Sequence, residues 1–171
     1  MRIHVNDQER LYGTYWTPMQ ERLGENLTEF IRHFLIRNGG ATKQGEVYFA
    51  LKEKADPKTQ EGIVAYLQEI AGFAELYLKL LNPALEPSAK VSQQMHRLNR
   101  IEVTTAYPFL LNVYHDFSLG RISEYEFAEV IGVLENFMIR RFVCGVPTYG
   151  LIKFSQRFTL RPTKTPRLSL A

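Results

Sequence analysis

Residues 123–158 read SEYEFAEVIGVLENFMIRRFVCGVPTYGLIKFSQRF, and they contain the strongest local structural signals of the chain. Ser123 followed three residues later by Glu126 is the pattern of a capping box, in which each side chain satisfies the other residue's backbone amide at a helix start. Gly145 and Pro147 predict where that helix ends, because glycine favours a helix C-terminus and proline cannot continue one. The stretch therefore predicts a long capped helix, a break, and a second short helix.

The long helix is expected to bury one side, because its apolar residues recur at helical spacing: Phe127, Val130, Ile131, Leu134, Phe137 and Met138. The only cysteine, Cys144, falls at the C-terminal end of this helix, where the helix dipole disfavours a thiolate. We interpret it as a buried structural residue. After the break, Thr148 can cap the short helix, which is expected from Tyr149 to about Phe158.

Helical periodicity also dominates upstream, and no segment shows the two-residue alternation of a strand. The third upstream helix, over about residues 44–54, is expected to bury Val47, Tyr48 and Leu51. Pro18 either kinks or restarts the first upstream helix, over about residues 7–23. The upstream helices are predicted over about residues 7–23, 26–38, 44–54, 57–81, 88–99 and 107–119. We therefore predict an all-α protein, an irregular bundle of about seven or eight helices.

The chain length of 171 residues permits one compact unit or a closely packed pair of helical subdomains. The two prolines at 83 and 87 mark the best linker. If there are two subdomains, they divide there. The predicted organisation is an N-terminal helical subdomain over 1–82, a linker over 83–88, a C-terminal helical subdomain over 89–158, and an extended or disordered basic tail over 159–171.

Charge is distributed unevenly along the chain. The first 135 residues carry 14 basic and 18 acidic residues, whereas the last 36 carry seven basic residues and no acidic one. Such a split can be the footprint of an anionic partner, with nucleic acid the commonest candidate, or it can reflect only that basic residues are favoured at helix C-termini and in solvated tails. The candidate DNA-backbone contacts are Arg140, Arg141, Lys153 and Arg157, with Tyr149 among them. Replacing Arg141 and Lys153 with alanine would then weaken binding to any DNA sequence.

No motif in the sequence assembles a reaction centre. The four histidines are scattered, so no metal site is predicted, and the glycine-rich phosphate loops and nucleophile motifs are missing. No catalytic residue, cofactor or metal is therefore expected. With one cysteine, no signal-peptide pattern and no apolar run of membrane-spanning length, the sequence predicts a cytoplasmic protein without a membrane partner.

The segment IRRFVCGVPTYGLIKFSQRF at 139–158 resembles the arginine-rich segment containing Cys, Gly, Pro and Thr in the GmrSD family of modification-dependent, type IV restriction endonucleases. Three other segments agree in kind and order, so that the resemblance covers most of residues 9–158: ERLYGTYWTPMQERLG at 9–24, FIRHFLIRNGG with the later VYFALK, and IEVTTAYPFLLNVYHDFSLGRISEYEF.

The resemblance implies a helical region lying between two catalytic modules. At the N-terminal end, members of the family resemble a ParB-like domain with an Asp-Gly-x-Gln-Arg motif. At the C-terminal end, they resemble a His-Asn-His-type nuclease. Neither motif occurs in this sequence. The tail after Phe158 also departs from the family's pattern, which argues against autonomous cleavage. We therefore expect the middle piece of such a protein, without enzymatic activity of its own.

Two roles follow from these expectations. The first is an architectural domain of a restriction protein in defence against foreign DNA, which links the ParB-like and nuclease modules and contacts the DNA backbone. The alternative is a stand-alone helical module that binds proteins and not DNA. An exposed apolar patch around Tyr12, Tyr15 and Trp16, where an N-terminal module would dock, would fit either role.

Overall fold

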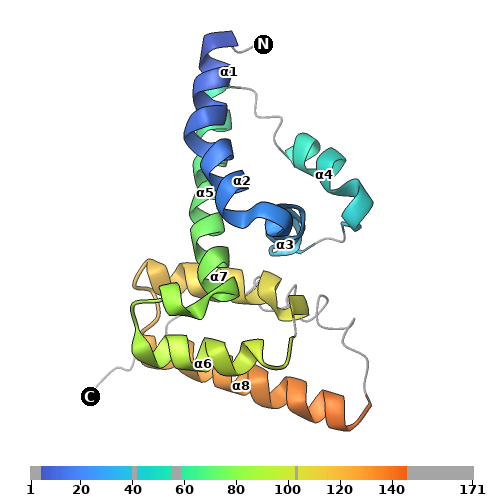
Figure 1. Ribbon diagram of the computed structural model, residues 1–171, viewed down its shortest axis with the longest axis vertical. Coiled ribbons are helices and arrows are strands. Elements are labelled where there is room, and N and C mark those ends of the chain that lie inside the picture. Colours follow the sequence, from blue (N-terminus) through green and yellow to red (C-terminus); the bar gives the residue numbers. More distant parts are fainter. Residues whose placement is uncertain (1–4, 40–41, 55–58, 103, 146–171) are drawn as a thin grey trace, which may run out of the picture.

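The structure is a computed structural model that describes residues 5–39, 42–54, 59–102 and 104–145. The described residues form helices and connecting turns and contain no strand, which confirms the predicted all-α fold. In Figure 1, the N-terminal helices and the long helix α5 occupy the upper part of the molecule, and α6, α7 and α8 lie across its lower end.

The first helical rod consists of α1 (Val5–Leu11), a π-helical turn (Tyr12–Trp16) and α2 (Thr17–Leu23). The Thr17 amide donates to the carbonyl of Tyr12, five residues back, so this turn contains one residue more than an α-helix would. Pro18 follows at once and has no amide to donate. The rod therefore continues through Pro18 with a bulge in place of a break.

Helix α3 (Leu27–Ile36) supplies much of the core, and α4 (Val47–Lys54) packs against it. The ammonium of Lys54 donates to the carbonyl of Leu35 at 2.7 Å, which satisfies a carbonyl in the last turn of α3. Of the residues expected to be buried in α4, Val47 is buried, but Tyr48 is exposed. The prediction for Tyr48 was wrong because α4 covers the core with one narrow face only.

Helix α5 (Gln60–Leu81) is the longest helix described, as expected. The hydroxyl of Thr59 caps it by accepting from the amide of Gly62 at 3.2 Å. The predicted start at Asp56 and Pro57 lies outside the described residues. At the other end, the helix stops at Asn82, where the sequence predicted its closure before Pro83.

The lower layer is formed by α6 (Ala89–Asn99), α7 (Tyr107–Ser118) and α8 (Glu124–Val143). Helices α6 and α8 lie side by side along their length (Figure 1). Ser88 caps α6 through its hydroxyl, which accepts from the amide of Val91 at 3.1 Å. These starts agree with the predicted ones.

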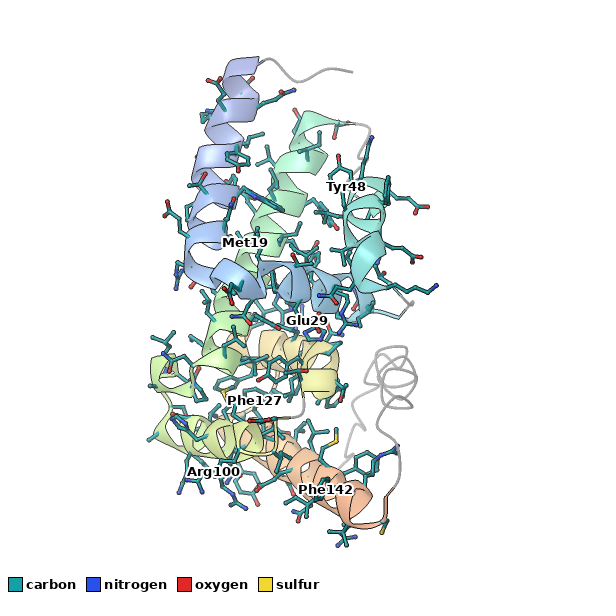
Figure 2. The ribbon with its side chains drawn as sticks, turned by 45° about the vertical axis from the view of Figure 1, so that its right-hand side comes forward. Met19, Glu29, Tyr48, Arg100, Phe127 and Phe142 are labelled. Carbon is teal, nitrogen blue, oxygen red and sulfur yellow. The ribbon has the colours of Figure 1, made fainter. Side chains whose placement is uncertain are left out.

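One hydrophobic core runs through both layers and includes residues from both sides of the predicted linker. In its upper part, the ring centroids of Phe30 and Tyr77 lie 5.2 Å apart, and those of Tyr77 and Tyr107 lie 5.6 Å apart. In the lower part, Phe127 points into the interior and packs on Tyr114 of α7 at 4.9 Å (Figure 2). The division into two subdomains at 83–88 stays a prediction.

Candidate functional site

The start of α8 has the geometry that its sequence predicts. The amide of Ser123 donates to Glu126 Oε2 at 2.7 Å, and the amide of Glu126 donates to Ser123 Oγ at 3.2 Å. This is a complete capping box. The hydrogen bond from the backbone of Ser123 lowers the pKa of the Glu126 carboxyl, because it stabilises the carboxylate. The capping box therefore fixes the residue at which α8 begins.

The end of α8 also agrees with the prediction. Gly145 has a φ of +65°, a conformation that favours glycine, and its amide donates to the carbonyl of Phe142 at 3.1 Å. Cys144, the capping residue, is exposed. The interpretation of Cys144 as a buried core residue was therefore wrong.

The reason lies in the length of α8, which extends beyond the helix beside it. Arg97 of α6 pairs with Glu135 of α8, with Nε 3.2 Å from Oε1. Helix α6 ends two residues after Arg97, whereas α8 continues for eight residues after Glu135. Phe142 is consequently 88% exposed and Val143 77% exposed. Figure 2 shows Phe142 at this projecting end.

Phe137 corrects a second expectation for α8. It was assigned to the buried side, but it is 38% exposed. The buried positions of the helix instead include Ala128 and Glu135. The core-facing side is therefore rotated toward α6, with which α8 makes its most extensive contact.

Two of the predicted DNA contacts, Arg140 and Arg141, lie in the last turn of α8. Arg140 is exposed, and Arg141 is half-buried with its guanidinium carbon 5.4 Å from the ring centroid of Phe137. Neither arginine forms an ion pair with a carboxylate of the described residues. Consecutive helical residues point about 100° apart, so the two arginines face different directions. Tyr149, Lys153 and Arg157 lie outside the described residues and stay predictions.

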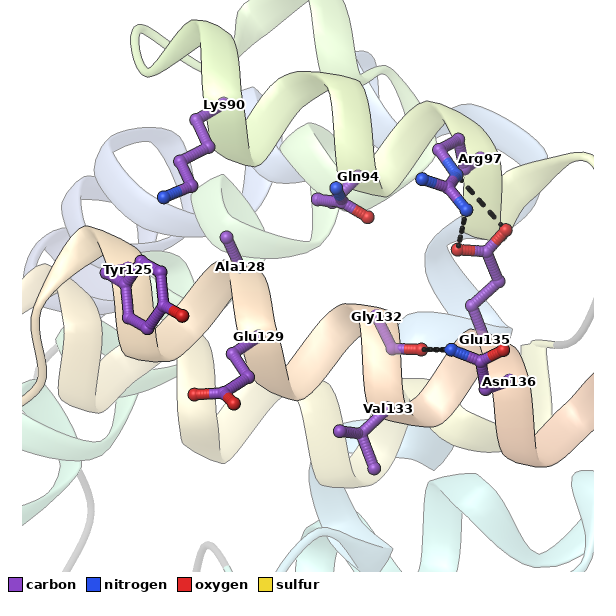
Figure 3. A pocket seen from close by; sticks show the side chains of 10 residues that line it. All are labelled: Lys90, Gln94, Arg97, Tyr125, Ala128, Glu129, Gly132, Val133, Glu135 and Asn136. Carbon is purple, nitrogen blue, oxygen red and sulfur yellow. Dashed lines mark hydrogen bonds and ion pairs between the residues drawn. The ribbon is translucent and has the colours of Figure 1, made fainter.

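A groove of about 360 Å³ runs between α6 and α8 on the surface of the molecule (Figure 3). Two of its four charged side chains, Arg97 and Glu135, pair with one another. The Lys90 ammonium lies 4.3 Å from the ring centroid of Tyr125, and Arg97 forms its ion pair with Glu135 across the groove. The ion pair across the groove thus connects the two helices. The polar groups of the groove do not converge on one point as a reaction centre requires.

The aromatic residues of the first rod do not form a single exposed patch. Tyr12 is largely exposed, but the hydroxyl of Tyr15 accepts a hydrogen bond from Gln68 of α5 at 2.9 Å. Trp16 packs against the core. Of the three residues expected in a docking patch, only Tyr12 presents most of its ring to solvent.

His33 is a fully buried histidine whose pKa is strongly lowered, and the sequence analysis gave it no special role. It is 0% exposed, with Nε2 3.0 Å from a carboxylate oxygen of Glu29 and Nδ1 3.2 Å from the Tyr77 hydroxyl. Nε2 also lies 3.1 Å from a guanidinium nitrogen of Arg32, which only donates, so the contacts of the ring fit either neutral tautomer. Burial lowers the pKa of His33 to about 4, against the opposing effect of Glu29 and with a smaller contribution from Arg32. This neutral imidazole is closed to solvent and cannot exchange protons with a bound molecule.

Two further charged residues, Arg37 and Glu86, are buried. Arg37 donates to the carbonyl of Phe34 at 2.6 Å and stacks on the Phe34 ring at 3.7 Å. Glu86, in the predicted linker, accepts hydrogen bonds from the Tyr114 hydroxyl and from the amide of Ser88. Both side chains hold neighbouring elements together. Sequence reasoning missed them because the side chains that pair with them, Glu69 for Arg37 and Tyr114 for Glu86, are distant in sequence.

Two other kinds of feature, a metal site and a membrane-spanning helix, are absent from the described residues. The described ranges contain no group of three or more His, Cys, Asp or Glu side chains that could hold a metal ion. Within the same ranges, every helix is too short or too polar to cross a membrane.

Comparisons with known protein families, with curated proteins and with solved structures found no match.

Proposed function

We propose that the protein is a non-catalytic helical domain that contacts the DNA backbone through the C-terminal end of α8 and the basic residues that follow it. The observation that carries the proposal is the position of Arg140 and Arg141, which have no carboxylate partner among the described residues at the projecting end of a long helix. Cations without a carboxylate partner are available to phosphate oxygens.

The resemblance to GmrSD-type restriction endonucleases supports the same role. In that family, the corresponding helical region lies between a ParB-like module and a nuclease module. The domain proposed for this protein would hold such modules together while its basic surface contacts DNA. Phosphate contact is independent of base sequence, so we expect no preference for a particular duplex from this surface alone.

The competing explanation is that the two arginines only complement the helix dipole at the C-terminus of α8. The two explanations differ in the affinity for DNA that they predict. Dipole complementarity stabilises the helix and gives no affinity for a duplex, whereas phosphate contact gives an affinity that falls steeply with salt concentration.

Replacing Arg140 and Arg141 together by alanine is expected to lower affinity for a short DNA duplex about tenfold at low salt. It should also reduce the slope of log affinity against log salt by about 2, since each lost phosphate contact removes about one unit. Fluorescence anisotropy of a labelled duplex, titrated at several salt concentrations, measures both quantities.

The matched control replaces Lys43 and Lys52 by alanine, because these two exposed cations lie near α4 and away from α8. The control variant should keep the affinity and the salt slope of the unchanged protein. Equal losses in the two variants would show a general effect of net charge and would contradict the proposed surface.

The exposed apolar residues at the same end of α8 favour a second candidate, a protein-interaction module. Phe142 and Val143 are the most exposed large apolar side chains described. Apolar side chains gathered at one place on a surface mark protein contacts more often than DNA contacts. Failure of the unchanged protein to bind the duplex even at low salt would favour this second function.

A further inference from the structure

The side of α8 that packs against α6 continues beyond the end of α6. Glu135 faces α6 through its ion pair with Arg97 (Figure 3). Ile139 and Phe142 follow Glu135 at spacings of four and seven residues, so all three side chains lie on the same side of the helix. Helix α6 ends at Asn99, close to the level of Glu135. The side of α8 that α6 covers is therefore open over the last turns of α8.

This open part of α8 is apolar. It consists of Ile139, Phe142 and Val143, which together form the α8 end patch and are 41%, 88% and 77% exposed. Met138, four residues before Phe142 and therefore nearly in line with it, is 3% exposed. The apolar side of α8 thus extends one helical turn past the part that the described core covers. A segment lying over the α8 end patch would remove this apolar surface from water, which is favourable.

We propose that residues 149–158 of the same chain fold back on α8 and cover the α8 end patch. The sequence of this segment, YGLIKFSQRF, predicts a short amphipathic helix. Leu151, Phe154 and Phe158 recur at spacings of three and four residues, so they share one side of that helix. The two basic residues of the segment point away from this side. The apolar side therefore suits the α8 end patch while the cations stay toward solvent.

The short connection after α8 favours this occupant. Gly145 has a φ of +65°, which turns the chain away from the helix axis. Five residues separate Val143, the last residue of α8, from the predicted helix start at Tyr149. A connection of this length joins two antiparallel helices that lie side by side. Leu151 follows the connection about as closely as Phe142 precedes it, so the two side chains come level with one another.

Other occupants of the α8 end patch are less favourable. A second copy or a partner protein has to associate from solution, whereas an attached segment is present at a roughly millimolar effective concentration. DNA would contact the cations at this end of α8 and leave Phe142 exposed. The inference requires no DNA, so it does not depend on the proposed function. A docked segment also places Lys153 and Arg157 at the end of α8 that carries the two predicted arginine contacts.

The first experiment measures hydrogen exchange of the full chain by mass spectrometry, because a segment held by one small patch opens locally without unfolding of the core. The backbone amides of residues 150–158 should exchange about tenfold or more slowly than unprotected amides, and Phe142→Gln should remove most of that protection. Val133→Gln is the matched control. Val133 is 65% exposed in the same helix, and nine residues separate it from Phe142, so it points to the opposite side. This control should keep the protection.

Three results of the exchange experiment would overturn the proposal. The first is exchange of the segment at the unprotected rate in the unchanged protein, and the second is equal protection in Phe142→Gln and Val133→Gln. The third is protection that rises with protein concentration, which would show that a second copy covers the α8 end patch. Exchange of the amides of α5, followed in the same samples, shows whether each variant keeps its core folded.

Disulfide formation tests the pairing of the two helices directly. In a Cys144→Ser background, Ile139→Cys combined with Phe154→Cys places two thiols at about the same level of the antiparallel pair. Arg140→Cys combined with Phe154→Cys is the matched control, because Arg140 is the next residue of α8 and points about 100° away from Ile139. With oxidised glutathione, the first pair should form its intramolecular disulfide about tenfold faster than the control pair. Equal rates, or a faster control pair, would overturn docking on this side of α8.

Discussion

Phe127→Ala is expected to lower the free energy of unfolding by about 3–5 kcal/mol. Phe127 is fully buried, and its ring centroid lies 4.9 Å from that of Tyr114 and 5.0 Å from that of Phe117. Truncation removes the apolar contact through which α8 is attached to α7, and these rigid helices cannot close the resulting cavity completely. Urea denaturation at neutral pH measures the loss.

The same helix offers a matched control for this prediction. Phe142→Ala makes the same chemical change at a position that is 88% exposed, so its effect should stay below about 0.5 kcal/mol. Comparable losses in the two variants would mean that the C-terminal end of α8 is covered in solution as firmly as the core. A loss below about 1 kcal/mol for Phe127→Ala would contradict the packing of the lower layer.

Acidification from pH 7.5 to pH 5 is expected to lower the free energy of unfolding by about 2 kcal/mol through His33 alone. Burial lowers the pKa of His33 to about 4 in the folded protein, whereas an unfolded histidine has a pKa near 6.5. Between these values, the unfolded chain binds a proton that the folded chain does not. The stabilisation is therefore complete above pH 6.5 and is lost progressively as the pH falls toward 4.

Two histidine variants isolate this effect. His33→Gln cannot titrate in this range, so its stability should be nearly independent of pH between 7.5 and 5, whatever its stability at neutral pH. His96→Gln, at an exposed position of α6, should keep the full pH dependence. The upper pH range is preferable because the pKa of Glu29 is also lowered, through its hydrogen bond to Arg32, and Glu29 contributes only near and below pH 4.5. A His33→Gln protein with an unchanged pH slope would contradict the assignment.

The helices that local signals mark were predictable from the sequence, and those that depend on distant contacts were less so. Ser123 with Glu126, and Asn82 with Pro83, act within one turn of the chain, so their consequences can be predicted without the rest of the structure. Thr59 shows the limit of such signals. It caps α5, although Asp56 and Pro57 are the stronger pattern in the sequence.

Burial was harder to predict than helix formation. Periodicity shows which residues share a face, but it does not show how far the neighbouring elements extend. Cys144 and Tyr48 were assigned to the core and are exposed, and Phe137, also assigned to the core, is 38% exposed. The buried charges of Arg37 and Glu86 were missed for the complementary reason, since their partners are distant in sequence: Arg37 pairs with Glu69, and Glu86 accepts from Tyr114.

For the candidate site, the sequence could predict the helical position of Arg140 and Arg141 but not their surroundings, and the other predicted contacts lie outside the described residues. Arg140 and Arg141 lie in the last helical turn, as expected. This turn projects beyond α6 because of the lengths of α6 and α8 and their placement beside one another. Neither is available from residue types alone.

The π-helical turn at Tyr12–Trp16 changes the phase of the first rod. In a uniform α-helix, Leu11 and Met19, eight residues apart, would point about 80° apart, yet both are buried. The extra residue closes most of that angle. Losing one residue within this turn would restore a regular helix while both flanking faces kept their orientation. The first rod can therefore vary in length by one residue at this position, whereas a single deletion within α5 would rotate every later side chain of that helix off its contacts.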